Sequence, residues 1–261
     1  MPPVTLVLLP GLDGTGDLFT HFASALPQHL DAKIVRYPPD RFFSYAELFP
    51  LVVDAVPRTQ PFVLLAESFS TPLAVKFAAT NPSNLRALVI CAGFIRNPVT
   101  GWLLRIKKFV RPSLFRVPPP RFALEYFLIG AHAPRELRSA VRSTMRSISP
   151  EVIALRVLAV MACDAREELT QVRVPTLYLQ AEEDRLVRKS CFEEIQRLKP
   201  DTILASIPAP HFVLQREPRK AADLIVHFLE GLPSRGAGPP FDSHDQNAGA
   251  AALRYFWHFG Q

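Results

Sequence analysis

The sequence predicts an α/β fold in which a mostly parallel sheet carries helices on both faces. Short, nearly continuous apolar runs alternate with helical patterns, as is typical of strands that are buried on both sides. This alternation stops between about residues 97 and 166, where apolar residues recur at helical spacing. The chain has 261 residues, 48% of them hydrophobic, which is enough for a sizeable core. We therefore expect an α/β unit with a helical insertion over the carboxyl edge of its sheet.

Strands are expected where apolar, β-branched runs end at turn residues. Six runs meet this description: residues 4–9, 33–37, 62–65, 85–92, 176–180 and 202–207. A helix is expected over residues 71–79, and a final amphipathic helix over residues 213–229.

These elements divide the chain into four parts. Residues 1–97 and 167–232 are expected to form the two parts of the core, and residues 98–166 the helical cap. From residue 233 to 261 the sequence becomes small and polar without periodicity, which predicts a flexible tail. Residues 255–259 are unusually aromatic for such a tail.

Charge and cysteine content narrow the class of protein. Lys and Arg outnumber Asp and Glu by 30 to 24, a modest net charge of +6, and we expect no nucleic-acid partner. The three cysteines lack paired spacing, which argues against a disulfide framework or a zinc site. No apolar run approaches the roughly 20 residues of a membrane span. Residues 1–3 lead straight into a strand and leave no room for a signal peptide, so we expect a soluble, cytoplasmic protein.

The segment with the clearest chemistry is LLAESFS, residues 64–70. A strand that ends in small-x-Ser-x-small and opens a helix is the pattern of a nucleophile elbow. In such a turn the serine backbone is strained, and the hydroxyl projects from the edge of the sheet. Ala66 and Ser70 stand where glycines are usual. The pattern indicates Ser68 as a nucleophile, and an ordinary serine at a helix N-terminus is the alternative.

An acid and then a histidine are expected beyond later strands. Asp184 follows residues 176–180, and His211 follows residues 202–207. A serine hydroxyl needs an adjacent base at neutral pH, so His211 is expected to take the proton of Ser68. Asp184 would hold the imidazole tautomer and stabilise the imidazolium. Two neighbouring residues are rival acids: Glu182 and Glu183.

An oxyanion hole of backbone N–H donors is the third requirement. Phe69 follows the nucleophile and is expected to supply one donor. The other is expected from the loop after the first strand, residues 10–16, with Leu12 as the donor. The glycines of this loop lack the G-x-G-x-x-G spacing, and no P-loop lysine follows them, which disfavours a nucleotide site.

Together these segments resemble the α/β-hydrolase superfamily, in its serine esterase and lipase branch. Residues 9–16 resemble the family's His-Gly oxyanion segment, with Pro10 in place of the histidine. Residues 66–70 resemble its elbow, and Asp184 and His211 match its acid and base positions. The resemblance implies a sheet of about eight strands, a helical cap, no cofactor, and hydrolysis of carboxylic esters through an acyl-serine intermediate.

The insertion is expected to roof the nucleophile and so to select the substrate. Apolar candidates for an acyl pocket are Trp102, Phe212 and Val213. Four arginines fall on one helical face: Arg135, Arg138, Arg142 and Arg146. This face is either an ordinary solvated surface or a surface that recruits an acidic carrier, such as acyl carrier protein or the phosphates of coenzyme A.

Two functions follow from these residues. The first is a serine hydrolase that cleaves small-molecule carboxylic esters with Ser68, His211 and Asp184. The alternative is an acyl thioesterase or acyltransferase that uses the same three residues on carrier-linked acyl groups. A non-enzymatic binding protein is disfavoured, because that class predicts the loss of at least one of the three.

Overall fold

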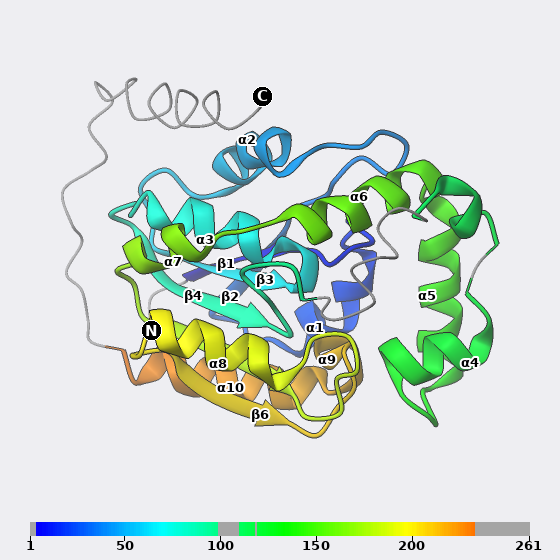
Figure 1. Ribbon diagram of the computed structural model, residues 1–261. Helices are drawn as coiled ribbons and strands as arrows, with labels where there is room; N and C mark the ends of the chain where they lie inside the picture. The colour runs from blue at the N-terminus through cyan, green and yellow to red at the C-terminus, as the bar shows by residue number, and fades with distance from the viewer. Residues whose placement is uncertain (1–3, 99–109, 118, 233–261) are drawn as a thin grey trace.

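The structure is a computed structural model that describes residues 4–98, 110–117 and 119–232 (Figure 1). Two expectations, on Trp102 and on the tail from residue 233, fall outside the described residues.

Six parallel strands form one sheet in this part of the chain. Their spatial order is β2 (Leu30–Ile34), β1 (Val4–Leu9), β3 (Phe62–Glu67), β4 (Leu85–Cys91), β5 (Thr176–Ala181) and β6 (Ile203–Ile207). The predicted α/β class with a parallel sheet is confirmed. The expected number of about eight strands is wrong for the described residues, because six runs are apolar and long enough to pair.

The second strand lies earlier in the chain than the predicted residues 33–37. It begins at Leu30, which pairs with Val4. Beyond the strand, the N–H of Tyr37 donates to the carbonyl of Gly14 at 2.7 Å. The last residues of the predicted strand therefore bind the loop after β1 instead of extending the ladder.

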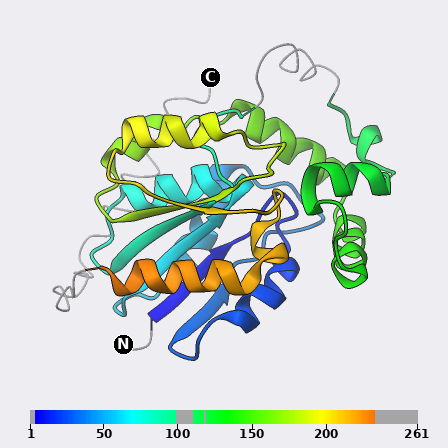
Figure 2. The ribbon, with the colours of Figure 1, turned by 90° about the horizontal axis from the view of Figure 1, so that it is seen from below.

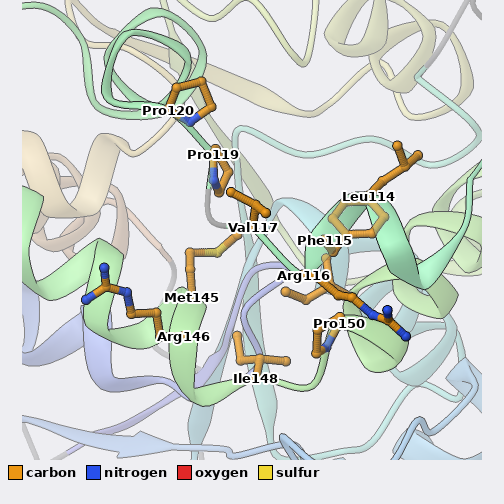
Figure 3. A pocket seen from close by; sticks show the side chains of 11 residues that line it. Leu114, Phe115, Arg116, Val117, Pro119, Pro120, Met145, Arg146, Ile148 and Pro150 are labelled. Carbon is orange, nitrogen blue, oxygen red and sulfur yellow. The ribbon is translucent and has the colours of Figure 1, made fainter.

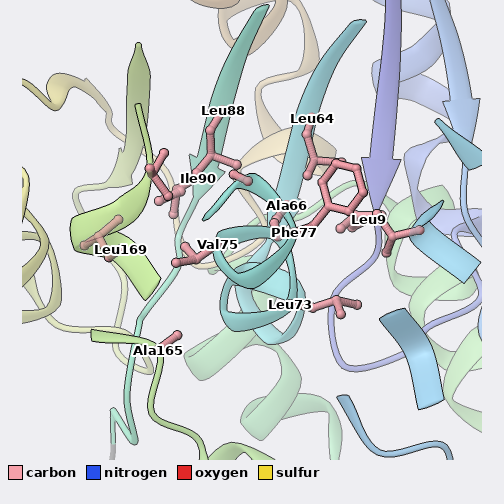
Figure 4. Close-up of a cluster of buried hydrophobic side chains, with 14 of the residues drawn as sticks. Leu9, Leu64, Ala66, Leu73, Val75, Phe77, Leu88, Ile90, Ala165 and Leu169 are labelled. Carbon is pink, nitrogen blue, oxygen red and sulfur yellow. The ribbon is translucent and has the colours of Figure 1, made fainter. Parts of the chain in front are cut away.

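Helices cover both faces of the sheet, because successive side chains of a buried strand point in opposite directions. Val7 and Leu9 of β1 belong to one apolar cluster, shown around α3 in Figure 4, and Leu6 and Leu8 belong to another. The first face carries α2 (Tyr45–Ala55), α3 (Thr71–Ala79), α7 (Arg166–Gln171) and α8 (Lys189–Leu198). The second face carries α1 (Thr20–Ala25) and α10 (Pro218–Glu230). Figure 2 shows α10 on the side of the sheet opposite to α3 and α8.

The helix predicted over residues 213–229 is interrupted. It consists of α9 (Val213–Arg216) and α10, which begins at Pro218. A proline disfavours helical backbone in the residue before it, and Glu217 has φ −128° and ψ 56°. The break separates the short helix that follows His211 from the long helix on the sheet.

The helical part of residues 110–162, here called the helical segment, lies beyond the carboxyl ends of the strands (Figure 1). It contains η4 (Pro112–Phe115), α4 (Arg121–Leu124), the π-helical turn η5 (Glu125–Ile129), α5 (Arg135–Ser147) and α6 (Pro150–Ala162). Its flanks lie side by side, because Arg96 and Asp164 form an antiparallel bridge. This bridge supports the cap boundaries near residues 98 and 166, which stay a prediction.

The helical segment is attached to the core through a small apolar cluster. Leu137 and Val141 of α5 belong to this cluster with Leu18 of η1 (Asp17–Phe19), and Phe212 packs against it. The segment thus contacts the core at the edge where the strands end. None of the helices in the described residues has the length and apolar character needed to cross a membrane.

Candidate active site

Ser68 occupies a strained turn between a strand and a helix. It begins the short turn η2 (Ser68–Ser70), which follows β3 and precedes α3. Its φ is +46°, in the left-handed region that residues other than glycine rarely adopt. Ala66 and Ser70 on either side are fully buried. This is the backbone geometry expected of a nucleophile elbow.

Ser70 stands where glycine is usual, and its side chain has a role of its own. Its hydroxyl donates to the carbonyl of Pro10, at the start of the loop after β1. The hydroxyl of Tyr37 lies 2.6 Å from the Ser70 oxygen and donates to it. The departure from glycine therefore ties the elbow to the loop of residues 10–16.

The three residues that the sequence indicated, far apart in the chain, lie in contact. The Nε2 atom of His211 is 3.0 Å from the Ser68 oxygen, and its Nδ1 atom is 2.7 Å from Oδ2 of Asp184. The side chains of His211 and Asp184 are 4% and 3% exposed. The parallel topology brings them together, since the loops after β3, β5 and β6 all leave the same edge of the sheet.

Asp184 is held in place by its own loop. Its second oxygen, Oδ1, accepts hydrogen bonds from the backbone N–H groups of Leu186 and Val187 at 2.8 and 2.9 Å. The rival acids Glu182 and Glu183 are exposed instead. Among the three acids of this loop, it is Asp184 that reaches His211.

The environment of His211 suits a general base. Burial lowers the pKa of its imidazole, but the charge and the hydrogen bond of Asp184 raise it by more, and Glu67 adds to this effect. The net result is a pKa above the usual 6.5. Since Asp184 binds Nδ1, the tautomer with its proton there leaves Nε2 free to accept the proton of Ser68.

The loop of residues 10–16 turns sharply beside the elbow. The N–H of Gly14 donates to the carbonyl of Gly11 at 3.1 Å, and Gly14 has a φ of +71°. Among the described residues, no backbone carbonyl accepts a hydrogen bond from the N–H of Leu12, the donor predicted for the oxyanion hole. An available backbone donor beside the elbow is what an oxyanion hole requires.

Phe69, the other predicted donor, is fixed by aromatic neighbours. Its ring stacks on Tyr45 at 5.0 Å between centroids and meets the edge of Tyr37 at 6.3 Å. The hydroxyl of Tyr45 also donates to the Phe69 carbonyl at 2.8 Å. These contacts hold the residue after the nucleophile in one position.

Glu67 is a site residue that the sequence did not indicate. Although a carboxylate usually lies at the surface, Glu67 is 2% exposed. Burial and, to a lesser extent, the charge of Asp13 raise its pKa to about 7, although hydrogen bonds from Gln215 and from the N–H of Gly11 oppose the rise. Nε2 of Gln215, in α9 after His211, donates to Glu67 at 3.0 Å. The only signal in the sequence was its place between the strand and the nucleophile.

Arg156 is a second residue near the candidate site that the sequence did not indicate. It lies in the middle of α6 and is 1% exposed, although arginine is rarely buried. Its guanidinium bonds to carbonyls of the loop after β1, more than a hundred residues earlier in the chain. No local pattern reveals such a contact.

A cavity of about 600 Å³ opens within the helical segment (Figure 3). Its lining is mostly apolar and comes from η4, the turn after it, α5 and α6: Leu114, Phe115, Arg116, Val117, Pro119, Pro120, Met145, Arg146, Ile148, Pro150 and Ile153. Leu12 packs against the cluster that contains Ile148 and Ile153. One wall of the cavity is therefore continuous with the loop beside Ser68.

The predicted pocket residues Phe212 and Val213 lie elsewhere. The ring of Phe212 is 6.0 Å from the ring of His211 and packs against the cluster around α5. Val213 is fully buried in the cluster on the α10 face of the sheet. Phe212 thus lies beside the candidate base, whereas Val213 belongs to the core.

No three His, Cys, Asp or Glu side chains in the described residues lie close enough together to hold a metal ion. The three cysteines are free: Cys91, Cys163 and Cys191.

A serine on an elbow, with a histidine and an aspartate from the loops after the last two strands, defines a serine-type hydrolase of the α/β-hydrolase superfamily. The family model described as serine aminopeptidase, S33, matches residues 43–202, which is more than half of the chain. The chain belongs to this family.

Relatives of known activity match most of the chain. The pimeloyl-[acyl-carrier protein] methyl ester esterase of Xanthomonas axonopodis pv. citri is 28% identical over 245 residues, which cover 87% of this chain and 96% of the relative. The protein of the same name from Xanthomonas oryzae pv. oryzae is 29% identical over the same shares.

Solved structures share the fold. A lipase-esterase related protein from Clostridium acetobutylicum has a TM-score of 0.72 at 14% identity, over 87% of this chain and 95% of its own. The enol-lactonase from Burkholderia xenovorans has a TM-score of 0.68 at 16% identity, over 88% and 92%. These similarities establish the α/β-hydrolase fold.

Proposed function

We propose that this protein cleaves carboxylic esters through an acyl-serine intermediate, with Ser68 as nucleophile, His211 as base and Asp184 as the acid that orients it. The observation that carries the proposal is the continuous chain of contacts from Ser68 to His211 and on to Asp184. The strained backbone of Ser68 and the raised pKa of His211 support it.

The reaction follows from these contacts in two halves. Ser68 Oγ attacks the ester carbonyl while its proton passes to Nε2 of His211. The tetrahedral intermediate collapses, the alcohol leaves with that proton, and the acyl group stays on Ser68. A water molecule then gives its proton to His211 and attacks the acyl carbon. The acid is released, and the proton returns to Ser68.

Charge develops twice in this reaction, and each charge has a partner. Asp184 stabilises the imidazolium of His211 through the 2.7 Å contact. The negative oxygen of the tetrahedral intermediate accepts hydrogen bonds from the backbone N–H groups of Leu12 and Phe69. Each such donor contributes roughly 10²–10³ in rate.

Labelling with a fluorophosphonate tests the proposal directly, because this probe reacts with an activated serine. The wild-type protein is expected to be labelled at Ser68, and Ser68→Ala to lose both labelling and the hydrolysis of p-nitrophenyl esters. Ser24→Ala, at an exposed serine of α1, is the matched control and should keep both. Full activity in Ser68→Ala would refute the proposal.

A carrier-linked substrate is the second candidate, and the surface of α5 favours it. Arg135, Arg142 and Arg146 are exposed there, whereas Arg138 is half-buried and lies 3.5 Å from Glu125. A basic surface next to the site fits an acidic carrier protein or the phosphates of coenzyme A. The named activity of the Xanthomonas relatives, on a methyl ester of a carrier-linked acyl group, supports this candidate.

The bond that is cleaved on such a substrate distinguishes ester from thioester chemistry. Product analysis with an acyl carrier that bears a terminal methyl ester separates the two: methanol marks ester cleavage, and a free carrier thiol marks thioester cleavage. An added alcohol that becomes acylated would mark acyl transfer instead.

A further inference from the structure

Arg156 is a buried cation whose hydrogen bonds all lead to backbone carbonyls near the candidate site. Nη1 donates to the carbonyls of Leu12 and Asp13 at 3.0 and 2.7 Å, and Nη2 donates to the carbonyl of Pro38 at 2.9 Å. The guanidinium also lies 5.8 Å from the centre of the Tyr37 ring. Burial lowers the pKa of Arg156, and Asp13 opposes this change.

Such a residue costs the fold more than an apolar one would. Removing a charged group from water is unfavourable unless it is paired and fully hydrogen-bonded. The Nε atom of Arg156 is buried without a partner, so its hydrogen bonding is incomplete. A leucine or methionine in α6 would avoid the cost of burying a charge, although the three carbonyls would lose this donor. The position of the guanidinium therefore points to a use other than packing.

The contacts of Arg156 fall on the peptide that follows Leu12, and the preceding peptide is held separately. The carbonyl of Gly11 is bound by the N–H of Gly14 at 3.1 Å. Because a trans peptide is planar, its N–H points away from its C=O, so this bond also sets the direction of the Leu12 N–H. Arg156 binds the carbonyl of Leu12 itself. Both peptide planes around this residue are thus held.

The loop is shaped to admit the guanidinium. A Cβ atom added at Gly14 would lie 2.5 Å from Nη1 of Arg156, and Gly14 has a φ of +71°. Both the space and the backbone conformation therefore require glycine here. On its other side the loop is bound by the elbow, through the hydroxyl of Ser70 on Pro10. Arg156 supplies the support from the side of the helical segment.

We propose that Arg156 is a positioning residue for the oxyanion hole, which holds the loop after β1 so that the N–H of Leu12 faces the oxygen that becomes negative during catalysis. This inference rests on the proposed serine hydrolase function. It also joins the helical segment to the chemistry, because α6 supplies the side chain that shapes a backbone donor on the core. A single donor of this kind is worth about 10²–10³ in rate.

The test compares Arg156→Met with Arg156→Lys. The methionine variant fills similar space without a donor, and we expect kcat to fall about 10²-fold while KM changes less than about threefold. The lysine variant keeps a charge, but its single nitrogen cannot replace both Nη1, which binds Leu12, and Nη2, which binds Pro38, so a smaller loss of about tenfold is expected. The pH midpoint of kcat/KM should stay unchanged, because the contact between His211 and Asp184 is untouched.

A second measurement separates positioning from stability. A trifluoromethyl ketone forms a hemiketal with Ser68, and the oxyanion of that adduct occupies the hole. Its inhibition constant should rise in Arg156→Met by the same factor as kcat falls, whereas the affinity for the product acid should not change. Lys199→Met is the matched control: Lys199 is also buried and pairs with Asp201 at 2.8 Å, away from the site. It should lower the melting temperature without affecting the inhibitor.

The outcomes are distinct. Wild-type kcat and inhibitor affinity in a folded Arg156→Met variant overturn the inference, as does a rise in KM at constant kcat. If Arg156→Met does not fold, wild-type kcat in Arg156→Lys overturns it. These results leave the proposed function intact as long as Ser68→Ala is inactive. An active Ser68→Ala variant would refute the proposed function itself.

Discussion

The sheet edge that carries Ser68 and the outer surface of the helical segment differ in how their polar side chains are placed. At the edge, His211 and Asp184 are buried, and each polar atom faces a partner inside the protein. On the outer surface of α5, by contrast, Arg135, Arg142 and Arg146 are exposed. Large apolar side chains of the helical segment, such as Phe122 and Tyr126, are exposed as well.

Charge sharpens the contrast. Residues 110–147 contain seven arginines and two glutamates, a net charge of +5 against +6 for the whole chain. A buried, bonded group of residues defines one reaction, whereas an exposed basic surface can only favour some partners over others. We therefore expect changes at the edge to affect every substrate and changes on the helical segment to affect some of them.

Removing His211, the proposed base, should give the largest effect. His211→Ala leaves Ser68 without a proton acceptor, so kcat should fall by about 10⁴-fold or more on small esters and carrier-linked substrates alike. His227→Ala, at an exposed histidine of α10, is the control and should keep full activity. A loss of activity on one substrate class alone would contradict the expectation that changes at the sheet edge affect every substrate. Steady-state kinetics on both classes measures it.

Asp184→Asn should cost about 10⁴-fold in kcat, because the wrong imidazole tautomer is favoured. It should also move the pH profile. The base acts when neutral, so kcat/KM of the wild-type falls as pH drops through the pKa of His211, which Asp184 holds above the usual 6.5. Without the carboxylate, burial is left to lower that pKa, and the midpoint should shift to lower pH. An unchanged midpoint would contradict the role of Asp184.

The buried carboxyl group of Glu67, at the same edge, should make the free energy of unfolding depend on pH. Its pKa is about 7 in the folded protein against the usual 4.5, so the unfolded state loses its proton first. The free energy of unfolding should therefore decrease as pH rises from about 4.5 to 7, by up to about 3 kcal/mol. Glu67→Gln should remove this pH dependence in urea unfolding at pH 5 and 8. Glu193→Gln, at an exposed acid of α8, should retain it.

The smallest effect on activity is expected from substitutions on the helical segment. Arg135→Glu together with Arg142→Glu should raise KM for carrier-linked substrates about tenfold at low salt and leave p-nitrophenyl esters unchanged. Arg219→Glu, exposed on α10 away from this surface, should affect neither. An equal change on both substrate classes would mean that the arginines act on the fold or on the site, and not on a carrier.

The elbow and its partners were predictable because each depends on a short local pattern plus one rule of topology. Parallel strands end at one edge, so a serine after one strand and an acid and a histidine after later strands meet there. The second strand was misplaced because Tyr37 pairs with Gly14 in a loop, and no local preference reveals that contact. Pro218 marks the break between α9 and α10 in the sequence. The apolar periodicity continues across this proline, and for that reason one unbroken helix was predicted.

The sequence by itself determined the fold class and indicated Ser68, Asp184 and His211 in their order along the chain, because short-range backbone preferences and hydrophobic alternation act within a few residues. The tertiary structure alone decided what surrounds them. Glu67 meets Gln215 across 148 residues, and Arg156 meets Leu12 across 144. Burial raises the pKa of Glu67 and lowers the pKa of Arg156. Contacts of that range arise from packing, whose energy depends on the whole arrangement of the chain and not on any segment of it.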